Sequence, residues 1–314
     1  MAPILEVQNL VKKFGELAAV AGVSFDIQEG EVYSLLGPNG AGKTTTISML
    51  SCLLAPTDGD ALIGGFSVTK EPMQVKRIIG VVPQEIALYD DLSARENLTF
   101  WGQMYGLGGS ALKERVEEVL EQIGLTERAR DRVKTFSGGM KRRVNIGVGL
   151  LHKPRLLFMD EPTVGIDPQS RRNILDSVKA LNQQGMTVLY TTHYMEEAEE
   201  LSHRVGIIDH GKMIAVGTQK ELTKLIGENE TLRLHIGEDL DAQPLIAALE
   251  ALPEVIHASA SDTQVVLIVP EAEDALSPVL VKADRMGFKV RSVDIEEPNL
   301  EAVFLQLTGR ALRD

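Results

Sequence analysis

One short stretch constrains the fold of this chain more than any other. Residues 37–44 read GPNGAGKT and fit the pattern G-x-x-x-x-G-K-[ST], directly after the apolar run VYSLL and before a run with helical character. Strand, loop and helix in that order are the context in which this pattern binds phosphate. Its glycines let backbone N–H groups face phosphate oxygens, Lys43 reaches the β- and γ-phosphates, and the Thr44 hydroxyl can ligate magnesium. The stretch therefore predicts a nucleoside triphosphate site between a strand and a helix.

The surrounding pattern agrees with that prediction. Short apolar runs alternate with amphipathic ones over the first ~220 residues, which is typical of an α/β domain with a largely parallel sheet. We expect buried strands over residues 32–37, 78–84, 155–161, 186–193 and 204–211. Ser93 with Glu96, and Thr218 with Glu221, have the spacing of capping boxes that begin helices. Residues 110–124 predict a helix with one apolar face, which Gly124 can end.

The pattern changes after a polar break at residues 224–230. We expect strands near 231–236, 254–260, 263–269 and 288–295, and helices near 242–251 and 272–286. That order, β-α-β-β-α-β, is the ferredoxin-like arrangement. A last amphipathic segment, residues 299–309, predicts a helix that packs back on the protein. The expected domains are therefore 1–222 and 230–314.

Composition excludes several classes of protein. The net charge of −13 argues against a nucleic-acid partner, because binding a phosphate backbone needs clustered Lys and Arg. Cys52 is the only cysteine, so a disulfide scaffold is excluded and a reducing cytoplasm is expected. No run approaches the ~18 apolar residues that span a bilayer, and the first ten residues lack the layout of a signal peptide. We expect a soluble protein.

A second motif supplies the metal anchor that a phosphate loop needs, usually an Asp at the end of a neighbouring buried strand. In LLFMDEP, four apolar residues lead to Asp160, and Glu161 follows where a carboxylate could accept a proton from an attacking water. An isolated Asp-Glu pair is more often a solvated strand end. Beside an intact phosphate loop, metal binding and base catalysis become the favoured interpretation.

With these motifs and SGGM at residues 137–140, the chain resembles the ATP-binding cassette (ABC) ATPases, the motor subunits of membrane transporters. The resemblance covers about residues 4–217 and comprises six motifs in the family's order. GPNGAGKTT matches the Walker A loop, LLFMDEPT matches Walker B, and FSGGM stands at the signature. Gln84 falls at the glutamine loop, Asp167 at the D-loop and His193 at the switch histidine.

The resemblance implies the fold class: an α/β P-loop NTPase cassette with a RecA-like core, an antiparallel β subdomain and a helical signature subdomain. A small α+β ferredoxin-like domain would follow it. The resemblance further implies ATP and Mg²⁺ as cofactors and an ATPase as the activity.

Roles follow for the matched residues. Glu161 would be the general base, with His193, Gln84 and Lys43 as the other catalytic residues. The residues expected to bind nucleotide are Phe14, Gly37, Pro38, Asn39, Gly40, Ala41, Gly42, Lys43, Thr44, Thr45, Ser137, Gly138, Gly139 and Asp167. The expected magnesium ligands are Thr44, Gln84 and Asp160. Taken alone, His193 would be a structural or solvated histidine and Phe14 a core residue.

The chain departs from the family's usual letters at four positions. The signature has Phe136 and Met140 where Leu and Gln are usual, and the D-loop has Val164 and Ile166 where Ser and Leu are frequent. The retained serine, glycines and aspartate leave the capacity to hydrolyse ATP intact. The substitutions bear on the finer contacts between subunits.

The resemblance also implies partners. The signature of one nucleotide domain faces the Walker A loop of another, and only one set of motifs is present. A homodimer or a paired nucleotide-binding subunit would therefore sandwich two ATP molecules head to tail. Separate transmembrane permease subunits would dock on residues 85–106, and the protein would be cytoplasmic and peripheral at the inner face of the cell membrane. The aromatic residues of LTFWGQMYG are either local core, the favoured interpretation, or a docking groove.

The C-terminal residues narrow the resemblance. EEPNLEAVFLQLTGR is similar to the tail of single-cassette ATPases of the drug-resistance and sodium-export type, which indicates an exporter. The added domain could regulate, dimerise or bind a small molecule. The alternatives are a soluble cassette ATPase acting in translation or DNA repair, and a nucleotide-binding regulatory module without turnover. Glu161 and His193 argue against the second.

Overall fold

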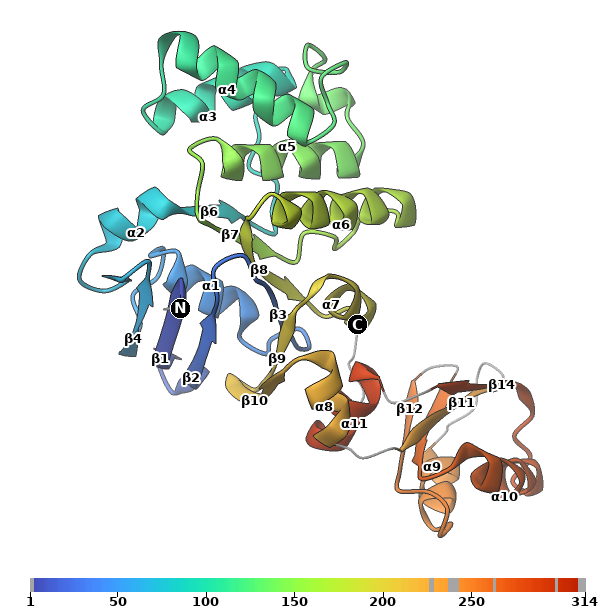
Figure 1. The fold of residues 1–314 in the computed structure, drawn as a ribbon. Helices are drawn as coiled ribbons and strands as arrows, with labels where there is room; N and C mark the ends of the chain where they lie inside the picture. Colours follow the sequence, from blue (N-terminus) through green and yellow to red (C-terminus); the bar gives the residue numbers. More distant parts are fainter. Residues whose placement is uncertain (1–2, 226–228, 237–242, 262–263, 297–298, 310–314) are drawn as a thin grey trace. The chain divides into compact units, whose positions relative to one another are not determined.

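In the computed structural model, the described residues are 3–225, 229–236, 243–261, 264–296 and 299–309. The chain forms two compact units, Met1–Val216 and Gly217–Asp314. Figure 1 shows their elements in the order of the chain. Among the described residues, no helix combines the length and the apolar character needed to cross a membrane.

A six-stranded sheet forms the centre of the first unit, in the order β10-β9-β3-β8-β7-β6. Its strands are β3 (Val32–Leu36), β6 (Ile79–Val82), β7 (Leu156–Asp160), β8 (Thr187–Thr192), β9 (Arg204–Asp209) and β10 (Lys212–Gly217). β3 pairs in parallel with β8 and β9, and β7 pairs in parallel with β6 and β8. The expected parallel sheet is confirmed, although β6 ends at Val82, before Gln84.

Both faces of this sheet are covered. Leu156 and Phe158 point into one core together with α1 (Lys43–Leu50). Leu157 and Met159, the alternate residues of the same strand, point into a second core with α5 (Gly138–Leu150) and α6 (Pro168–Gln183). Burial on both faces explains the continuous apolar runs of the sequence.

A second sheet, with the order β2-β1-β4-β5, packs on the other side of α1. Its strands are β1 (Leu5–Phe14), β2 (Leu17–Ile27), β4 (Asp58–Ile63) and β5 (Phe66–Ser67), and neighbouring strands pair antiparallel. This is the antiparallel β subdomain that the resemblance implied. The periodicity of these residues had not predicted it.

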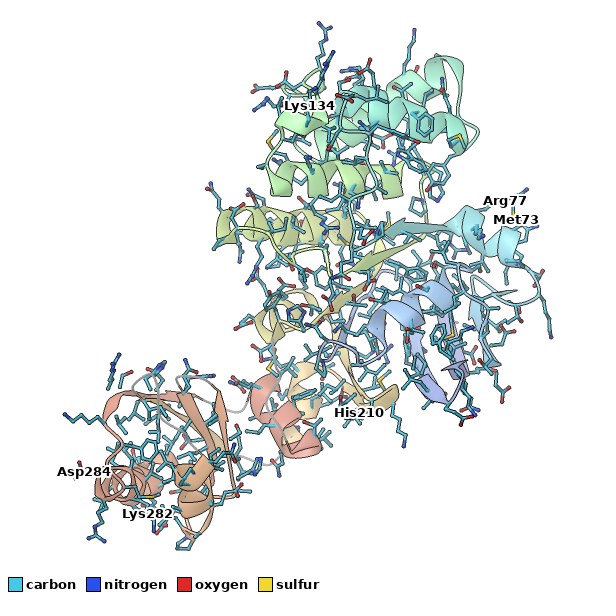
Figure 2. All side chains as sticks on the ribbon, turned by 180° about the vertical axis from the view of Figure 1, so that it is seen from behind. Met73, Arg77, Lys134, His210, Lys282 and Asp284 are labelled. Carbon is cyan, nitrogen blue, oxygen red and sulfur yellow. The ribbon has the colours of Figure 1, made fainter. Side chains whose placement is uncertain are left out.

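A helical layer lies beyond the β6 and β7 side of the six-stranded sheet (Figure 1). It contains α3 (Ala94–Met104), α4 (Gly109–Gln122), the 3₁₀ turn η1 (Val133–Thr135) and α5. The capping box of Ser93 and Glu96 is present, and α4 ends before Gly124, whose φ is +63°. α2 (Pro72–Ile78) precedes β6, and Figure 2 shows Met73 and Arg77 pointing outward from it. In the same view Lys134 extends from the helical layer, and it pairs with Asp91.

The aromatic residues of α3 divide between the two expected roles. Trp101 packs against the core, and Phe100 lies edge-on to Tyr89 and Trp101. Met104 and Tyr105 are 68% and 43% exposed. The local-core interpretation therefore holds for Trp101 but is wrong for the last two residues.

The second unit begins with α8 (Gln219–Leu225), which the expected Thr218–Glu221 capping box precedes. Its four-stranded sheet has the antiparallel order β12-β13-β11-β14. The elements are β11 (Glu230–Ile236), α9 (Gln243–Glu250), β12 (His257–Ser261), β13 (Gln264–Val269), α10 (Ala272–Arg285) and β14 (Val290–Glu296). α11 (Leu300–Thr308) is the last helix and contacts α8.

The expected β-α-β-β-α-β order is thus confirmed, with two shifts in the strand boundaries. β12 begins at His257, because residues 252–254 form a turn, and β14 begins at Val290. Residues 242 and 263, which the sequence had placed at the edges of a helix and a strand, lie outside the described part. The apolar sides of the strands and of α9 and α10 enclose a core of their own.

Candidate functional site

Three neighbouring strands end at the same edge of the six-stranded sheet. β8 lies between β3 and β7, so the residues that follow these strands converge. Gly37 N donates to Thr192 O at 3.3 Å, and Glu161 N donates to Thr191 O at 3.2 Å. The end of β8 therefore connects the Walker A loop on one side with the Asp160–Glu161 pair on the other. In parallel α/β sheets this edge is where ligands bind.

The Walker A loop folds tightly before α1. Gly42 has φ +106°, and a Cβ atom there would lie 2.6 Å from Ala19 O, so only glycine fits. Lys43 is buried, and its Nζ donates to Gly37 O at 2.6 Å and to Pro38 O at 2.9 Å. Asn39, Gly40 and Thr44 are exposed, Pro38 and Thr45 are half-buried and Ala41 is buried. The loop thus presents its tip to solvent while holding the lysine inside.

Asp160 is a buried carboxylate at the end of β7. It accepts a hydrogen bond from Thr191 Oγ1 at 2.7 Å. Burial raises the pKa of Asp160, and the hydrogen bonds with Thr191 and Thr44 oppose that rise without cancelling it. A carboxylate that is costly to ionise where it stands is suited to a cation.

Glu161 lies between two other site residues. Its Oε1 is 2.8 Å from Lys43 Nζ, and its Oε2 is 3.3 Å from His193 Nδ1. All three side chains are almost fully buried. Burial alone would raise the pKa of Glu161, but the contacts with His193 and Lys43 outweigh it and lower the pKa to about 2. The backbone of Glu161 has φ +42°, an uncommon conformation for a residue other than glycine.

The site fits magnesium bound together with nucleotide. Thr44 and Asp160 provide a hydroxyl and a carboxylate in contact with each other. Among the described residues, no group of three or more His, Cys, Asp and Glu could hold a metal. Mg²⁺ needs no such group here, because in nucleotide sites one or two protein ligands act with phosphate oxygens.

Phe14 and Gln84 lie apart from this buried cluster. Phe14, the last residue of β1, is 51% exposed with Lys12 Nζ 5.3 Å from its ring centroid, so the core interpretation of Phe14 is wrong. Gln84 is exposed after β6, and its carbonyl accepts a hydrogen bond from Arg142 at 2.6 Å. The ring of Phe14 and the amide of Gln84 are both accessible to a ligand.

The signature begins α5. Ser137 is the N-cap, and its Oγ accepts a hydrogen bond from Met140 N at 3.2 Å. Gly138 is exposed, whereas Gly139 is buried against Ser170. Asp167 caps α6 in the same way, accepting from Ser170 N at 2.9 Å. Ser137, Gly138, Gly139 and Asp167 form a second group at the starts of α5 and α6. Their described contacts lie within these two helices, and none is with Lys43.

Three of the four unusual residues contact the core of the helical layer. Phe136 is 7% exposed in the core of the helical layer, and Met140 packs against the same core. Ile166 also contacts this core and lies 3.4 Å from the position of a Cβ on Gly138. Phe136 is therefore a core residue here, while the following Ser137 and Gly138 are exposed.

Sequence reasoning missed Thr191, whose hydroxyl contacts the Asp160 carboxylate and the backbone of Glu161. Its Oγ1 donates to Asp160 and accepts from Glu161 N at 3.0 Å. The signal was a threonine directly after the apolar run of residues 188–190 and two positions before His193. It also missed Glu197, a carboxylate that is only 2% exposed.

Comparison with known proteins gives a consistent result. The family model for ABC transporters matches residues 20–164. The linearmycin resistance ATP-binding protein LnrL of Bacillus subtilis (strain 168) is 49% identical over 313 residues, 99% of this chain and 100% of that protein. Nod factor export ATP-binding protein I of Ralstonia nicotianae is 38% identical over 320 residues, 99% of this chain and 96% of that protein. A solved dimeric ATP-binding cassette in a post-hydrolysis state with ADP and Pi is 28% identical, has a TM-score of 0.62, and aligns over 68% of this chain and 98% of its own.

Proposed function

The chain belongs to the ABC transporter family of ATP-binding proteins, and from that premise we propose how its residues bind and hydrolyse ATP. It is the ATP-hydrolysing subunit of an ABC exporter. The relatives are resistance and export proteins by name, which does not favour the alternative of a soluble ATPase in translation or DNA repair. The observation that carries the proposal is the contact of Glu161 with both Lys43 and His193.

Nucleotide binding uses the Walker A loop and an aromatic ring. Adenine stacks on the exposed face of Phe14, and the phosphates lie on the backbone N–H groups of residues 37–45. The Lys43 ammonium turns from Glu161 to the β- and γ-phosphates, because a triphosphate carries more charge than one carboxylate. Thr44, Asp160 and Gln84 would hold Mg²⁺, which would neutralise charge on the phosphates.

Glu161 then acts as the general base. While Lys43 pairs with it, its pKa of about 2 makes it a weak base. When Lys43 moves to the phosphates, the loss of that cation raises the pKa of Glu161 and strengthens the base. Glu161 accepts a proton from water, the oxygen attacks the γ-phosphorus, and the bond to the β-phosphate oxygen breaks to leave ADP. His193 orients the water and the γ-phosphate.

A second copy, or a paired nucleotide-binding subunit, completes each site. Ser137, Gly138 and Gly139 are at the start of α5, where N–H groups and the helix dipole attract a phosphate. A solved ATP-binding cassette is dimeric in a post-hydrolysis state with ADP and Pi, which supports a dimer. We place these residues against the partner's nucleotide in a head-to-tail arrangement. Asp167, exposed at the start of α6, lies on the same interface.

Members of this family work with separate transmembrane subunits. We place the docking surface on residues 85–106. Ile86, Tyr89, Met104 and Tyr105 are exposed there by 37–68% of their surface. Exposed apolar side chains near one another commonly mark an interface. The protein would then sit at the inner face of the cell membrane, and the membrane subunits would select the exported molecule.

Glu161→Gln tests the proposed base. The amide keeps the size of the side chain but cannot accept the proton, so we expect steady-state hydrolysis to fall by about a thousandfold or more. ATP binding should persist, and an ATP-dependent dimer should accumulate in size-exclusion chromatography. Parental hydrolysis in this variant would refute the role of Glu161, and a monomer at saturating ATP would refute the sandwiched dimer.

A further inference from the structure

A buried polar cluster joins α6 to α7 (Met195–Leu201), two helices that are neighbours in the first unit (Figure 1). At its centre is Glu197, whose Oε2 accepts hydrogen bonds from Tyr190 OH and Thr192 Oγ1, both at 2.9 Å. Its Oε1 has no hydrogen bond among the described residues and lies 3.7 Å from Arg171 Nε. Arg171, on α6, is thus the cation that faces this buried carboxylate.

Arg171 also contacts the residue next to the switch histidine. Its Cζ lies 4.3 Å from the ring centroid of Tyr194, and the Tyr194 ring lies 4.1 Å from the ring of His193. Tyr194 N donates to Thr192 Oγ1 at 2.9 Å, the same hydroxyl that donates to Glu197. Arg171 therefore touches Tyr194 directly and reaches Thr192 through Glu197, so it acts on both chain neighbours of His193.

We propose that Arg171 is a positioning residue for His193: its guanidinium, lying on Tyr194 and facing Glu197, sets the orientation of the His193 ring toward Glu161. The inference rests on the proposed role of His193 in hydrolysis. His193 Nδ1 lies 3.3 Å from Glu161, and a small rotation of the ring would lose that contact. The two weak contacts of Arg171, with Tyr194 and Glu197, are therefore enough to affect the orientation of the ring. A guanidinium over an aromatic ring and a cation beside a buried carboxylate both favour one arrangement.

The position of Arg171 in α6 connects this arrangement to the signature. Its N–H donates to Asp167 O at 2.9 Å, so it belongs to the first turn after the D-loop aspartate. The preceding residue, Ser170, is the one against which Gly139 packs. A movement of α5 against α6, as when the signature meets a partner's nucleotide, would therefore shift the same turn that carries Arg171. The orientation of His193 in each copy would therefore depend on the nucleotide bound in the partner's Walker A loop.

The test compares Arg171→Ala with Arg172→Ala in the full-length chain. Arg172 is the matched control, because it is the next residue, its side chain is 57% exposed, and it pairs with Asp176 of α6 and Glu200 of α7 instead of with Glu197. We expect Arg171→Ala to lower kcat about tenfold with KM for ATP within about twofold, since no contact with the Walker A loop changes. Arg172→Ala should change neither. Equal kcat values for the two variants, or a change confined to KM, would overturn the proposal.

A double-mutant cycle separates positioning from general support of the fold. If Arg171 acts through His193, then Arg171→Ala should cause no further loss in a His193→Ala background, measured under single-turnover conditions with the protein in excess. The same tenfold loss in both backgrounds would show that Arg171 acts elsewhere. Tyr194→Leu should reproduce the effect of Arg171→Ala and settles the question if Arg171→Ala does not fold. In that case a parental kcat for Tyr194→Leu overturns the inference.

The same variants distinguish failure of the proposed role of His193 from failure of the positioning role of Arg171. If His193→Ala hydrolyses ATP at the parental rate, the proposed function of His193 fails and the inference fails with it. If His193→Ala is impaired and both Arg171→Ala and Tyr194→Leu are unchanged, only the positioning role fails.

Discussion

Lys43 and Glu161 are each other's nearest opposite charge, 2.8 Å apart and both buried. The ion pair lowers the pKa of Glu161, so Glu161 is a weak base. It also keeps the ammonium group of Lys43 buried. Two carbonyl groups of the Walker A loop share the lysine, which makes its exchange toward phosphate a short movement. At the scale of the residue, Lys43 is therefore placed to exchange the Glu161 carboxylate for phosphate when nucleotide binds.

The pH dependence of stability reports this ion pair. The pKa of Glu161 lies at about 2 instead of 4.5. A carboxylate with a lowered pKa stabilises the folded state above its ordinary pKa, and the contribution is lost as the pH falls from about 4.5 toward 2. Glu161→Gln should therefore lower the free energy of unfolding by roughly 3 kcal/mol at pH 7, because it leaves Lys43 without its counter-ion.

Urea unfolding at pH 7, 5.5 and 3.5 measures that difference. It should be the same at pH 7 and 5.5 and smaller at pH 3.5, where the parent begins to lose the contribution of the ionised carboxylate. A difference that is equal at all three values would mean that Glu161 is not held ionised by Lys43 and His193.

At the scale of the element, the two glycines that begin α5 have different tasks. A Cβ on Gly139 would lie 2.3 Å from the Cβ and Oγ of Ser170, so α5 and α6 approach as closely as they do only because this residue has no side chain. A Cβ on Gly138 would meet Ile166 at an ordinary 3.4 Å. Of these two adjacent glycines, Gly139 thus allows the close packing of α5 on α6, whereas Gly138 remains exposed to solvent.

We expect Gly139→Ala to cost about 1–3 kcal/mol of stability through overpacking, and Gly138→Ala to stay within about 0.5 kcal/mol of the parent. Helix propensity favours alanine at both positions equally, so the comparison isolates the contact with Ser170. Thermal unfolding of the two variants without nucleotide provides the measurement. Equal melting temperatures would contradict the close approach of α5 to α6.

At the scale of the whole molecule, the cores of the first unit share no residue with the core of the second. Leu189 belongs to a core of the first unit and Leu267 to the core of the second. Both side chains are fully buried. We propose that the cassette and the C-terminal part are separately folding domains, since an individual core is what allows a domain to fold by itself.

Calorimetry of the full chain tests this proposal. Leu267→Ala should cost about 2–5 kcal/mol and lower one unfolding transition, whereas Leu189→Ala should lower the other. ATP should raise only the transition that Leu189→Ala affects, because a ligand stabilises the unit that binds it. A single transition that both substitutions lower would contradict separate folding.

The motifs, the parallel sheet and the β-α-β-β-α-β order of the second unit could all be predicted from the amino-acid sequence. These follow from local spacing: the Walker A loop lies between a strand and a helix, and Asp160 ends an apolar run. The contact of Glu161 with Lys43 and His193, the exposure of Phe14 and the position of Arg171 beside Tyr194 became visible only in the folded protein. Each of these depends on residues that are far apart in the chain and meet because of strand order and helix packing, which no local pattern records.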